Sequence, residues 1–536
     1  MAEKSFAGHR APRSRRDLLA LIGTVAGGAA MYQAMTSLGH AQESPYRGPP
    51  RLSGDPRGAS VVILGAGLVG MVAALELRQA GYRVQILEYD TRAGGRCWTI
   101  RGGDRVEELG GAVQSCTFDD GQYLNPGPWR IPHHHHAVMD YCRRLGVQLE
   151  PFVQVNHAAL VHSTRAFGGK PVPYREVQAD YHGAVAELLA KATRAGALDA
   201  DLTREDAEVL LESLRAFGAL DGHFRYARNA SASARRGWDR RPAGGVDAAP
   251  VPSTPVSAKD VVSSRLWANL ASGAALDFQT TMFEPVGGMD MIARAFAREL
   301  GQGTITYGAR VTAIRQDARG VTVAWEDRRD GGATRTTQAD WCVNTIPLSV
   351  LAQLDVQCGA PMANAIAAVP YSASIKVGLQ MKRRFWETDH HIYGGISYTD
   401  LPNRMISYPS TGYLSPGKGV LLAAYAFGPF AFEYTALNPE ERVRRTVEWA
   451  SRLHPEIAAE FDGGISVGWH RVPGALGCNG MWTEASRREH YANLCAIDGR
   501  MVLAGEHCSY IPAWQEGSIL SALDAITRLH ARVMAG

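Results

Sequence analysis

The 536-residue chain lacks several features that mark common protein classes. Its eight cysteines are scattered without a CxxC pair, which argues against a zinc ribbon or a thioredoxin-type redox motif. The formal net charge of +3 is near neutral for this length, so neither nucleic-acid binding nor an acidic tail is expected. No internal repeat is visible, and outside the N-terminal segment no apolar run is long enough to cross a membrane. With 46% hydrophobic and 20% charged residues, the composition is that of a globular protein with two or three domains.

An export signal is predicted at the N-terminus. Arg15 and Arg16 precede an apolar stretch from Leu18 to about Met35, and small residues suit cleavage after Ala41. A twin arginine before a moderately apolar core is typical of a Tat signal, which is read by an export machinery that carries folded proteins. The stretch is short and interrupted by glycines, so a cleaved signal is favoured over a membrane anchor. We therefore expect residues 1–41 to be a Tat signal and the protein to be periplasmic or secreted.

The most informative segment begins at Val61. An apolar run leads into Gly65-Ala66-Gly67-Leu68-Val69-Gly70 and a helical pattern, and a second apolar run ends at Glu88. A strand, GxGxxG, a helix and a second strand ending in an acid form the dinucleotide-binding fingerprint. In this interpretation Gly65 permits the tight turn, Gly67 lets the backbone approach a pyrophosphate at the helix N-terminus, and Gly70 lets the helix pack. Glu88 is placed to accept hydrogen bonds from a ribose.

A second glycine motif narrows the cofactor to FAD. Thr91-Arg92-Ala93-Gly94-Gly95-Arg96 follows the acidic strand end directly. Gly95 suits a second close approach to the cofactor, and Arg96 suits a phosphate as charge partner; a glycine turn with a surface arginine is the alternative. The segment resembles the start of the flavin amine oxidase family, which includes monoamine oxidases and L-amino acid oxidases. Nicotinamide dehydrogenases usually lack this second element.

The resemblance covers nearly all of the mature chain and implies an α/β fold. It consists of a discontinuous Rossmann-like FAD-binding domain, a sheet-based substrate domain and a helical insertion. With the strand and helix patterns, we expect the FAD domain at 58–125, 283–347 and 498–536, the mainly helical insertion at 126–282 and the substrate domain at 348–497. Residues 229–257 have few large apolar side chains and are expected to form a mobile loop.

Further cofactor contacts are expected from the resemblance. The glycine pair Gly110 and Gly111 would supply one contact, and Val311 would pack beside the adenine ring. The C-terminal run Ala504 to Gly517 resembles a second family signature. Its acid would bind the ribityl chain, and backbone N–H groups at the start of the last helix would face a flavin oxygen whose negative charge grows on reduction. The residues in question are Gly110, Gly111, Val311, Gly505, Glu506, Glu516 and Gly517.

A carboxylate clamp is predicted from two residues. The block Gly127-Pro128-Trp129-Arg130-Ile131-Pro132 resembles one in L-amino acid oxidases whose arginine binds the substrate carboxylate. A guanidinium can grip a carboxylate with two parallel hydrogen bonds, although an arginine paired with a structural acid is the alternative. In an alternative alignment with the family, Gln114 stands at the position of this arginine. Tyr425 matches the family tyrosine that also binds the carboxylate, or is a buried strand tyrosine. Together Arg130 and Tyr425 favour an amino acid over a simple amine.

Other candidate site residues also follow from the resemblance. Lys376 stands in an apolar strand, where a buried ammonium is costly, and matches a catalytic lysine that holds a water near the flavin. A strand-edge lysine that reaches solvent is the alternative. Trp514 matches one wall of an aromatic cage and is assigned catalytic and substrate-binding roles, and Trp469 matches a tryptophan near the flavin; each is alternatively core. Asn479 stands where the second cage wall is a tyrosine in monoamine oxidases and would shape a different substrate pocket.

The state of the FAD depends on Cys478. This cysteine matches the one that monoamine oxidases bond to FAD, whereas L-amino acid oxidases lack it and bind FAD noncovalently. The tyrosine that follows the cysteine in monoamine oxidases is missing here. Noncovalent FAD is therefore favoured over a link through Cys478.

Four adjacent histidines, residues 133–136, raise the question of a metal site. On a helix, adjacent side chains point in different directions, and no second cluster in the sequence supplies a closing ligand. A polar helix start is favoured, and no metal is expected.

These features predict an FAD-dependent L-amino acid oxidase. It would convert an L-amino acid, water and dioxygen to a 2-oxo acid, ammonia and hydrogen peroxide. The alternatives are an oxidase or dehydrogenase for amines without an α-carboxylate, an amino acid 2-monooxygenase that gives an amide, and a non-catalytic FAD-binding protein. The substrate side chain, the disulfides and the oligomeric state stay open, with a homodimer as one option.

Overall fold

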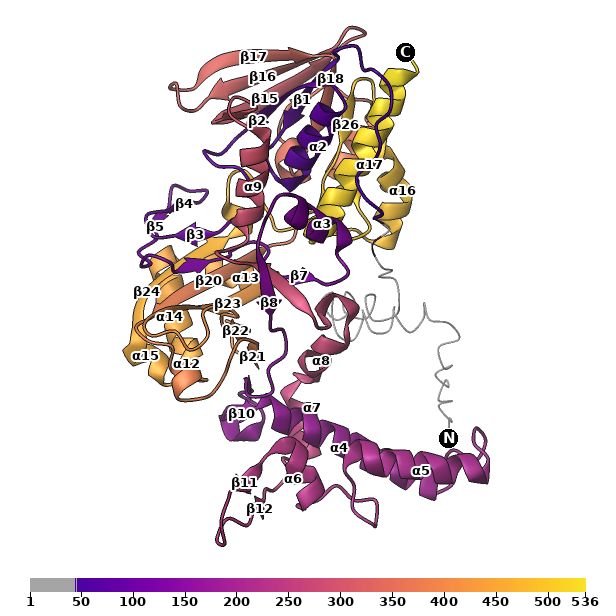
Figure 1. The fold of residues 1–536 in the computed structure, drawn as a ribbon, viewed down its shortest axis with the longest axis vertical. Coiled ribbons are helices and arrows are strands. Elements are labelled where there is room, and N and C mark those ends of the chain that lie inside the picture. Colours follow the sequence, from indigo (N-terminus) through magenta and orange to yellow (C-terminus); the bar gives the residue numbers. More distant parts are fainter. Residues whose placement is uncertain (1–43, 45) are drawn as a thin grey trace, which may run out of the picture.

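The computed structural model describes Ser44 and residues 46–536. The predicted export signal at 1–41 lies outside these residues. Two sheet-based regions lie one beyond the other along the long axis, and a helical arm extends at the far end (Figure 1). In the part of the chain that the structure describes, no helix combines the length and the apolar character needed to cross a bilayer. The predicted α/β class is confirmed.

The first region is built on a six-stranded sheet with the order β14-β2-β1-β18-β26-β25. Neighbouring strands are parallel except β25, which pairs antiparallel with β26 at the edge. The strands come from distant parts of the chain, so this domain is discontinuous. They are β1 (Ser60–Leu64), β2 (Arg83–Glu88), β14 (Ile305–Tyr307), β18 (Trp341–Asn344), β25 (Ile497–Asp498) and β26 (Met501–Leu503).

Both faces of this sheet are covered. Val61 and Ile63 of β1 pack against helices, whereas Val62 and Leu64 face a second, four-stranded sheet. Alternate residues of a strand point to opposite faces, so a strand buried on both sides needs the continuous apolar run seen in the sequence. The helices are α2 (Leu68–Gln79), α3 (His136–Arg144), α9 (Asp290–Leu300) and α17 (Gln515–Met534), and the second sheet is β17 (Ala333–Ala339), β16 (Val321–Asp327), β15 (Ala309–Gln316) and β19 (Asp355–Val356).

The second region is a seven-stranded sheet with the order β10-β9-β21-β22-β23-β20-β24. Strand β20 (Ser374–Met381), between β23 and β24, is buried along its whole length. Ile375 and Val377 pack under helices, so the alternation of the strand turns Lys376 to the opposite face. The other strands are β9 (Leu160–His162), β10 (Val172–Pro173), β21 (Ile396–Thr399), β22 (Met405–Ser407), β23 (Gly419–Phe427) and β24 (Phe461–Gly468); the helices are α12 (Phe385–Thr388), α13 (Pro429–Thr435), α14 (Pro439–Ala450) and α15 (Glu456–Glu460).

The insertion is mainly helical and forms the arm in Figure 1. A three-stranded sheet, β7-β13-β8, connects it to the rest of the molecule. The strands are β7 (Ile131–Pro132), β8 (Leu149–Phe152) and β13 (Met282–Pro285), and the helices are α4 (Tyr174–Arg194), α5 (Arg204–Gly218), α6 (Ala230–Arg236), α7 (Ala258–Ser264) and α8 (Trp267–Leu270).

The expectation of a loop over residues 229–257 is wrong at both ends of that segment. It contains α6 and a hairpin of β11 (Trp238–Arg240) and β12 (Val251–Pro252). Arg236, at 2% exposure, holds the segment through ion pairs to Glu176 and Asp180 of α4, both at 2.9 Å, and a hydrogen bond to Ser253. The prediction from apolar content did not identify this anchor, because the anchor consists of charged groups that are far apart in the sequence.

Two domain boundaries also differ from the expected ones. Helices α10 (Leu348–Leu351), α11 (Ala360–Ala367) and α16 (Glu484–Cys495), expected in the substrate domain, contribute to the apolar cluster beneath the six-stranded sheet. Strands β9 and β10, expected in the insertion, join the seven-stranded sheet. Both differences arise because strand pairing and apolar packing connect segments that the order of the sequence separates.

Candidate active site

A large cavity is lined by residues of both sheet regions. Its volume is about 3170 Å³, whereas pockets for a single small molecule usually have about 300–1,000 Å³. The lining extends from the glycine turn after β1 to Arg130, Tyr425 and Trp514. The cavity therefore has room for a dinucleotide and a substrate together.

The glycine turn has the shape that a pyrophosphate site requires. Gly65 has a φ of +105°, a conformation that other residues rarely adopt. A Cβ on Gly70 would lie 2.0 Å from the Gly65 carbonyl oxygen, so only glycine lets α2 pack this close. Gly67 caps α2 and forms a bridge to Gly94, and a Cβ on it would meet no protein atom within 4 Å. The open approach to the N-terminus of α2 fits the anion site predicted there.

Glu88 lies at the end of β2 and lines the same cavity. Its carboxylate accepts hydrogen bonds from the backbone N–H groups of Ala66, at 2.5 Å, and Asp90, at 2.7 Å. Burial raises the pKa of Glu88 to about 7. Val311, predicted beside an adenine, also lines this part of the cavity.

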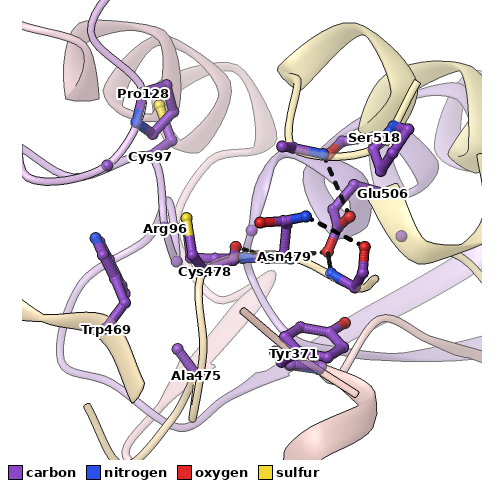
Figure 2. A pocket seen from close by; sticks show the side chains of 18 of the residues that line it. Arg96, Cys97, Pro128, Tyr371, Trp469, Ala475, Cys478, Asn479, Glu506 and Ser518 are labelled. Atoms are coloured by element: carbon purple, nitrogen blue, oxygen red, sulfur yellow. Dashed lines mark hydrogen bonds and ion pairs between the residues drawn. The ribbon is translucent and has the colours of Figure 1, made fainter. Parts of the chain in front are cut away.

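Arg96 pairs with an acid of the protein, a partner that the sequence did not suggest. It donates hydrogen bonds to Glu506, at 2.9 Å, and to the carbonyl oxygen of Cys478, at 2.6 Å (Figure 2). Glu506 also accepts one from the N–H of Gly480. Both residues line the cavity, as do Gly95 and Gly505, so the pair forms one charged section of its wall.

Four of the expected cofactor residues are not among those that line the cavity. Gly110 and Gly111 form the turn between β4 (Arg105–Glu107) and β5 (Val113–Ser115), outside the cavity lining. The carboxylate of Glu516 accepts hydrogen bonds from Ala137 and Val138 at the start of α3, both at 3.0 Å, and Gly517 packs against Ile511. The first turn of α17 instead meets the cavity through its other face: Trp514, Gln515 and Ser518. The motif locates this helix end, but the helical periodicity decides which residues face the cavity.

Cys478, Asn479 and Trp469 all line the cavity. Burial raises the pKa of the Cys478 thiol, so the reactive thiolate is disfavoured. The side chain of Asn479 accepts a hydrogen bond from Ser372, and the indole N–H of Trp469 donates to the carbonyl oxygen of Pro126 at 2.8 Å.

Arg130 is held by aromatic rings in the cavity wall. Its guanidinium carbon lies 4.7 Å from the ring centres of both Trp129 and Phe278. Cation–π contacts of this kind fix the orientation of the guanidinium plane. Gln114, the rival residue, is bound to the backbone of Ser466 and does not line the cavity.

Lys376 and Tyr425 are cross-strand neighbours, because β20 and β23 pair them directly. The Lys376 ammonium nitrogen lies 4.6 Å from the ring centres of both Trp129 and Tyr425 and donates to the carbonyl oxygen of Gly127 at 2.5 Å. At 1% exposure it does not reach solvent, which contradicts the strand-edge alternative. Burial first, and then the nearby Arg130, lower the pKa of Lys376 well below its usual value. The structure thus brings the predicted Arg130, Lys376 and Tyr425 to one place.

Trp514 lies beside residues that the sequence analysis missed. Its ring centre is 5.1 Å from that of His135 and 6.0 Å from that of Phe278. His134 and His135 approach Asp277 at 3.2 and 3.8 Å, and all three line the cavity. Burial raises the pKa of Asp277, but the hydrogen bond with His134 and the proximity of His135 outweigh it and bring the pKa down to about 2.

The expectation that no side chain would close a ligand set at these histidines is therefore wrong. His133 to His135 precede α3 rather than belong to it, so successive side chains are not separated by the helical rotation. His134, His135 and Asp277 offer ligand atoms within 4.8 Å of one another. The four adjacent histidines were the signal in the sequence for this cluster. Their partner, Asp277, lies more than a hundred residues away, so no local pattern includes it.

Comparison with known proteins identifies a family. Residues 68–529 match the family of flavin containing amine oxidoreductases. An L-amino-acid oxidase of Siganus canaliculatus is 26% identical over 479 residues, which is 88% of this chain and 86% of that protein. An L-amino-acid oxidase of Bothrops pauloensis is 27% identical over 471 residues, 87% of this chain and 88% of that protein.

The fold also matches a solved structure. Cyclohexylamine oxidase from Brevibacterium oxydans IH-35A superposes with a TM-score of 0.59 at 16% identity, over 89% of this chain and 100% of that chain. The resemblance to flavin amine oxidases is thus confirmed, and a family of oxidoreductases argues against the non-catalytic alternative. The chain belongs to the flavin-containing amine oxidoreductase family, and this membership implies FAD as its cofactor.

Proposed function

We propose that the protein is an L-amino acid oxidase. It converts an L-amino acid, water and dioxygen to a 2-oxo acid, ammonia and hydrogen peroxide. The observation that carries the proposal is the position of Arg130 in the cavity wall, between two aromatic rings and near Tyr425. The relatives described as L-amino-acid oxidases support it.

Arg130 binds the substrate carboxylate through two N–H donors. The rings of Trp129 and Phe278 keep the guanidinium oriented before the substrate arrives, so little side-chain entropy is lost on binding. They also exclude water, and a charge pair is stronger in the resulting low dielectric. Tyr425, whose ring centre lies 5.6 Å from that of Trp129, adds a hydroxyl donor to the same anion.

Burial and Arg130 lower the pKa of Lys376 well below its usual value, which favours its neutral amine form. A neutral amine on Lys376 does not compete with Arg130 for the carboxylate and can hydrogen-bond a water that hydrolyses the imino acid product. When bound, FAD supplies the two-electron oxidation of the amino acid, and dioxygen takes up the electrons. The chain itself positions the substrate and excludes water.

The test is a comparison of amino acids with their decarboxylated amines. Bleaching of the flavin absorbance under anaerobic conditions measures each substrate. L-amino acids should bleach it, and their amines and D-enantiomers should not. In Arg130→Ala the half-saturating amino acid concentration should rise by about 100-fold, since a hydrogen bond to a charged group contributes about 1.5–3 kcal/mol. Arg143→Ala, at an exposed arginine of α3, is the control and should bind as the wild type does.

Two other outcomes would assign a different function to the protein. Bleaching by amines alone, unchanged in Arg130→Ala, would assign the protein to the oxidases of amines without an α-carboxylate. A carboxamide in place of the 2-oxo acid in the product mass spectrum would indicate an amino acid 2-monooxygenase.

We also propose that the protein is exported folded through the Tat pathway, as the twin arginine before an apolar stretch suggests. Replacement of Arg15 and Arg16 by lysine should leave the protein in the cytoplasm, whereas the wild type reaches the periplasm or the medium. Cell fractionation with a flavin assay measures this. Equal export of both proteins would contradict the proposal.

A further inference from the structure

A second cluster of ligand-type side chains lies in the seven-stranded sheet region. His390 follows α12, His454 lies between α14 and α15, and Glu456 is the first residue of α15. The three offer ligand atoms within 4.8 Å of one another. None of them lines the large cavity, so the cluster has no part in the proposed oxidation.

Two buried atoms of the cluster have no hydrogen-bond partner among the described residues. They are Nδ1 of His454, a residue with 0% exposure, and Oε2 of Glu456. An unsatisfied buried polar atom costs about 1–3 kcal/mol, and such atoms are rare in native proteins. Two such atoms occur among three potential metal-binding residues, which indicates that the cluster is suited to bind a ligand.

The other side of His454 is tied to the protein. Its Nε2 lies 2.6 Å from the hydroxyl of Tyr408, which lies 2.6 Å from Ser397 Oγ. A metal-binding histidine almost always uses its second ring nitrogen in such a hydrogen bond, which fixes the ring and its tautomer. Because Nε2 of His454 is hydrogen-bonded to Tyr408, Nδ1 is the nitrogen that can bind a metal ion. The Phe385 ring packs against the rings of both His390 and His454 and limits their rotation further.

The spacing and chemistry of the cluster match those of a transition metal site. Nε2 of His390 lies 3.1 Å from Oε1 of Glu456, and two ligand atoms bound to one tetrahedral zinc ion lie ~3.3 Å apart. Imidazole nitrogen suits zinc and its neighbours, whereas calcium and magnesium prefer oxygen ligands alone. We propose that His390, His454 and Glu456 bind a divalent transition metal ion of the zinc class, with water in the fourth position.

The bound ion would join the segment after α12 to the turn between α14 and α15. Both segments cover the face of the seven-stranded sheet opposite Lys376. A metal that binds only the folded protein stabilises it by mass action, so the expected role is structural.

The test is metal binding to the FAD-loaded protein after treatment with a chelator and dialysis. Titration with Zn²⁺ should show a site that depends on the cluster and should raise the melting temperature. Co²⁺ in the same site should give the intense visible absorption of a tetrahedral complex. His390→Ala and Glu456→Gln each remove one ligand and should weaken Zn²⁺ binding by at least about tenfold. His490→Ala, at a histidine beside Glu489 on α16, is the matched control and should bind as the wild type does.

His390 and Glu456 are partly exposed, so both substitutions are compatible with folding, which an unchanged flavin spectrum would verify. The absence of Zn²⁺ binding to the wild type would overturn the proposal. Binding that is equally strong in both variants, whether at His134 and Asp277 or elsewhere, would overturn it as well. Neither result would affect the proposed oxidase activity, which rests on other residues.

Discussion

Single residues of the cavity owe their chemistry to burial. Cys478 lines the cavity, and Lys376 contacts the lining residues Trp129 and Tyr425. Burial disfavours the charged form of each. For Lys376 this favours a neutral amine beside the predicted carboxylate site. For Cys478 it gives a protonated thiol, which is a poor nucleophile.

FAD is therefore expected to be noncovalent. Heat or acid precipitation of the wild type should release the flavin into the supernatant, and Cys478→Ser should bind FAD to the same extent. Absorbance of the supernatant at the flavin maximum measures the release. Flavin that stays with the precipitated wild type and is released from Cys478→Ser would show a covalent bond instead.

At the scale of elements, one strand pair carries two facing acids. Glu284 of β13 and Glu150 of β8 are direct neighbours in the register, and each has an oxygen without a hydrogen-bond partner among the described residues. Burial first, and then Glu150, raise the pKa of Glu284 to about 8. The folded protein thus binds a proton at this residue that the unfolded chain has lost above about pH 4.5.

Because the folded pKa is the higher one, the stability that this proton contributes is lost as the pH rises from about 4.5 through 8. The loss is on the order of 5 kcal/mol for a shift of this size. Glu284→Gln cannot ionise and should lose less stability than the wild type between pH 5 and pH 8.5, as measured by urea unfolding. Glu205→Gln, at an exposed position of α5, is the control. Equal pH dependence of all three proteins would contradict the assignment.

At the scale of the whole molecule, the arm depends on one buried ionic network. Arg236 connects α6 to two acids of α4, and Tyr226 and the N–H of Val256 donate to the same Asp180. The network therefore holds the segment around residues 229–257 against the long helix of the arm. Loss of one partner from a buried ion pair costs about 3–5 kcal/mol, because the other charge stays buried.

Arg236→Met should release this segment while the FAD domain stays folded. Limited proteolysis should cut the variant between residues 229 and 257 faster than the wild type, and the bound flavin should remain. Arg241→Met, at an exposed arginine of the same segment, should be cut at the wild-type rate. A wild-type cleavage rate in Arg236→Met would show that other contacts hold the arm.

Much of the FAD domain could be predicted from local sequence. The glycine turn, the acid at the end of β2 and the apolar runs are contiguous, and each specifies its own element through backbone conformation or strand alternation. Arg130, Lys376 and Tyr425 were predicted by resemblance, and the structure brings them together. The same reasoning placed Gly110, Gly111, Glu516 and Gly517 at the cofactor. They are not among the residues that line the cavity, and the backbone N–H contacts expected at Glu516 and Gly517 stay predictions.

Local sequence is sufficient to identify the family, the cofactor class and the strand–turn–helix that begins the cofactor site, because these depend on neighbouring residues. The side-chain partners depend on the tertiary fold. The pairs of Arg96 with Glu506, of His134 with Asp277 and of Glu284 with Glu150, as well as the cluster around His454, join residues tens to hundreds of positions apart. Such contacts are set by strand register and by the packing of distant segments, which no local pattern encodes.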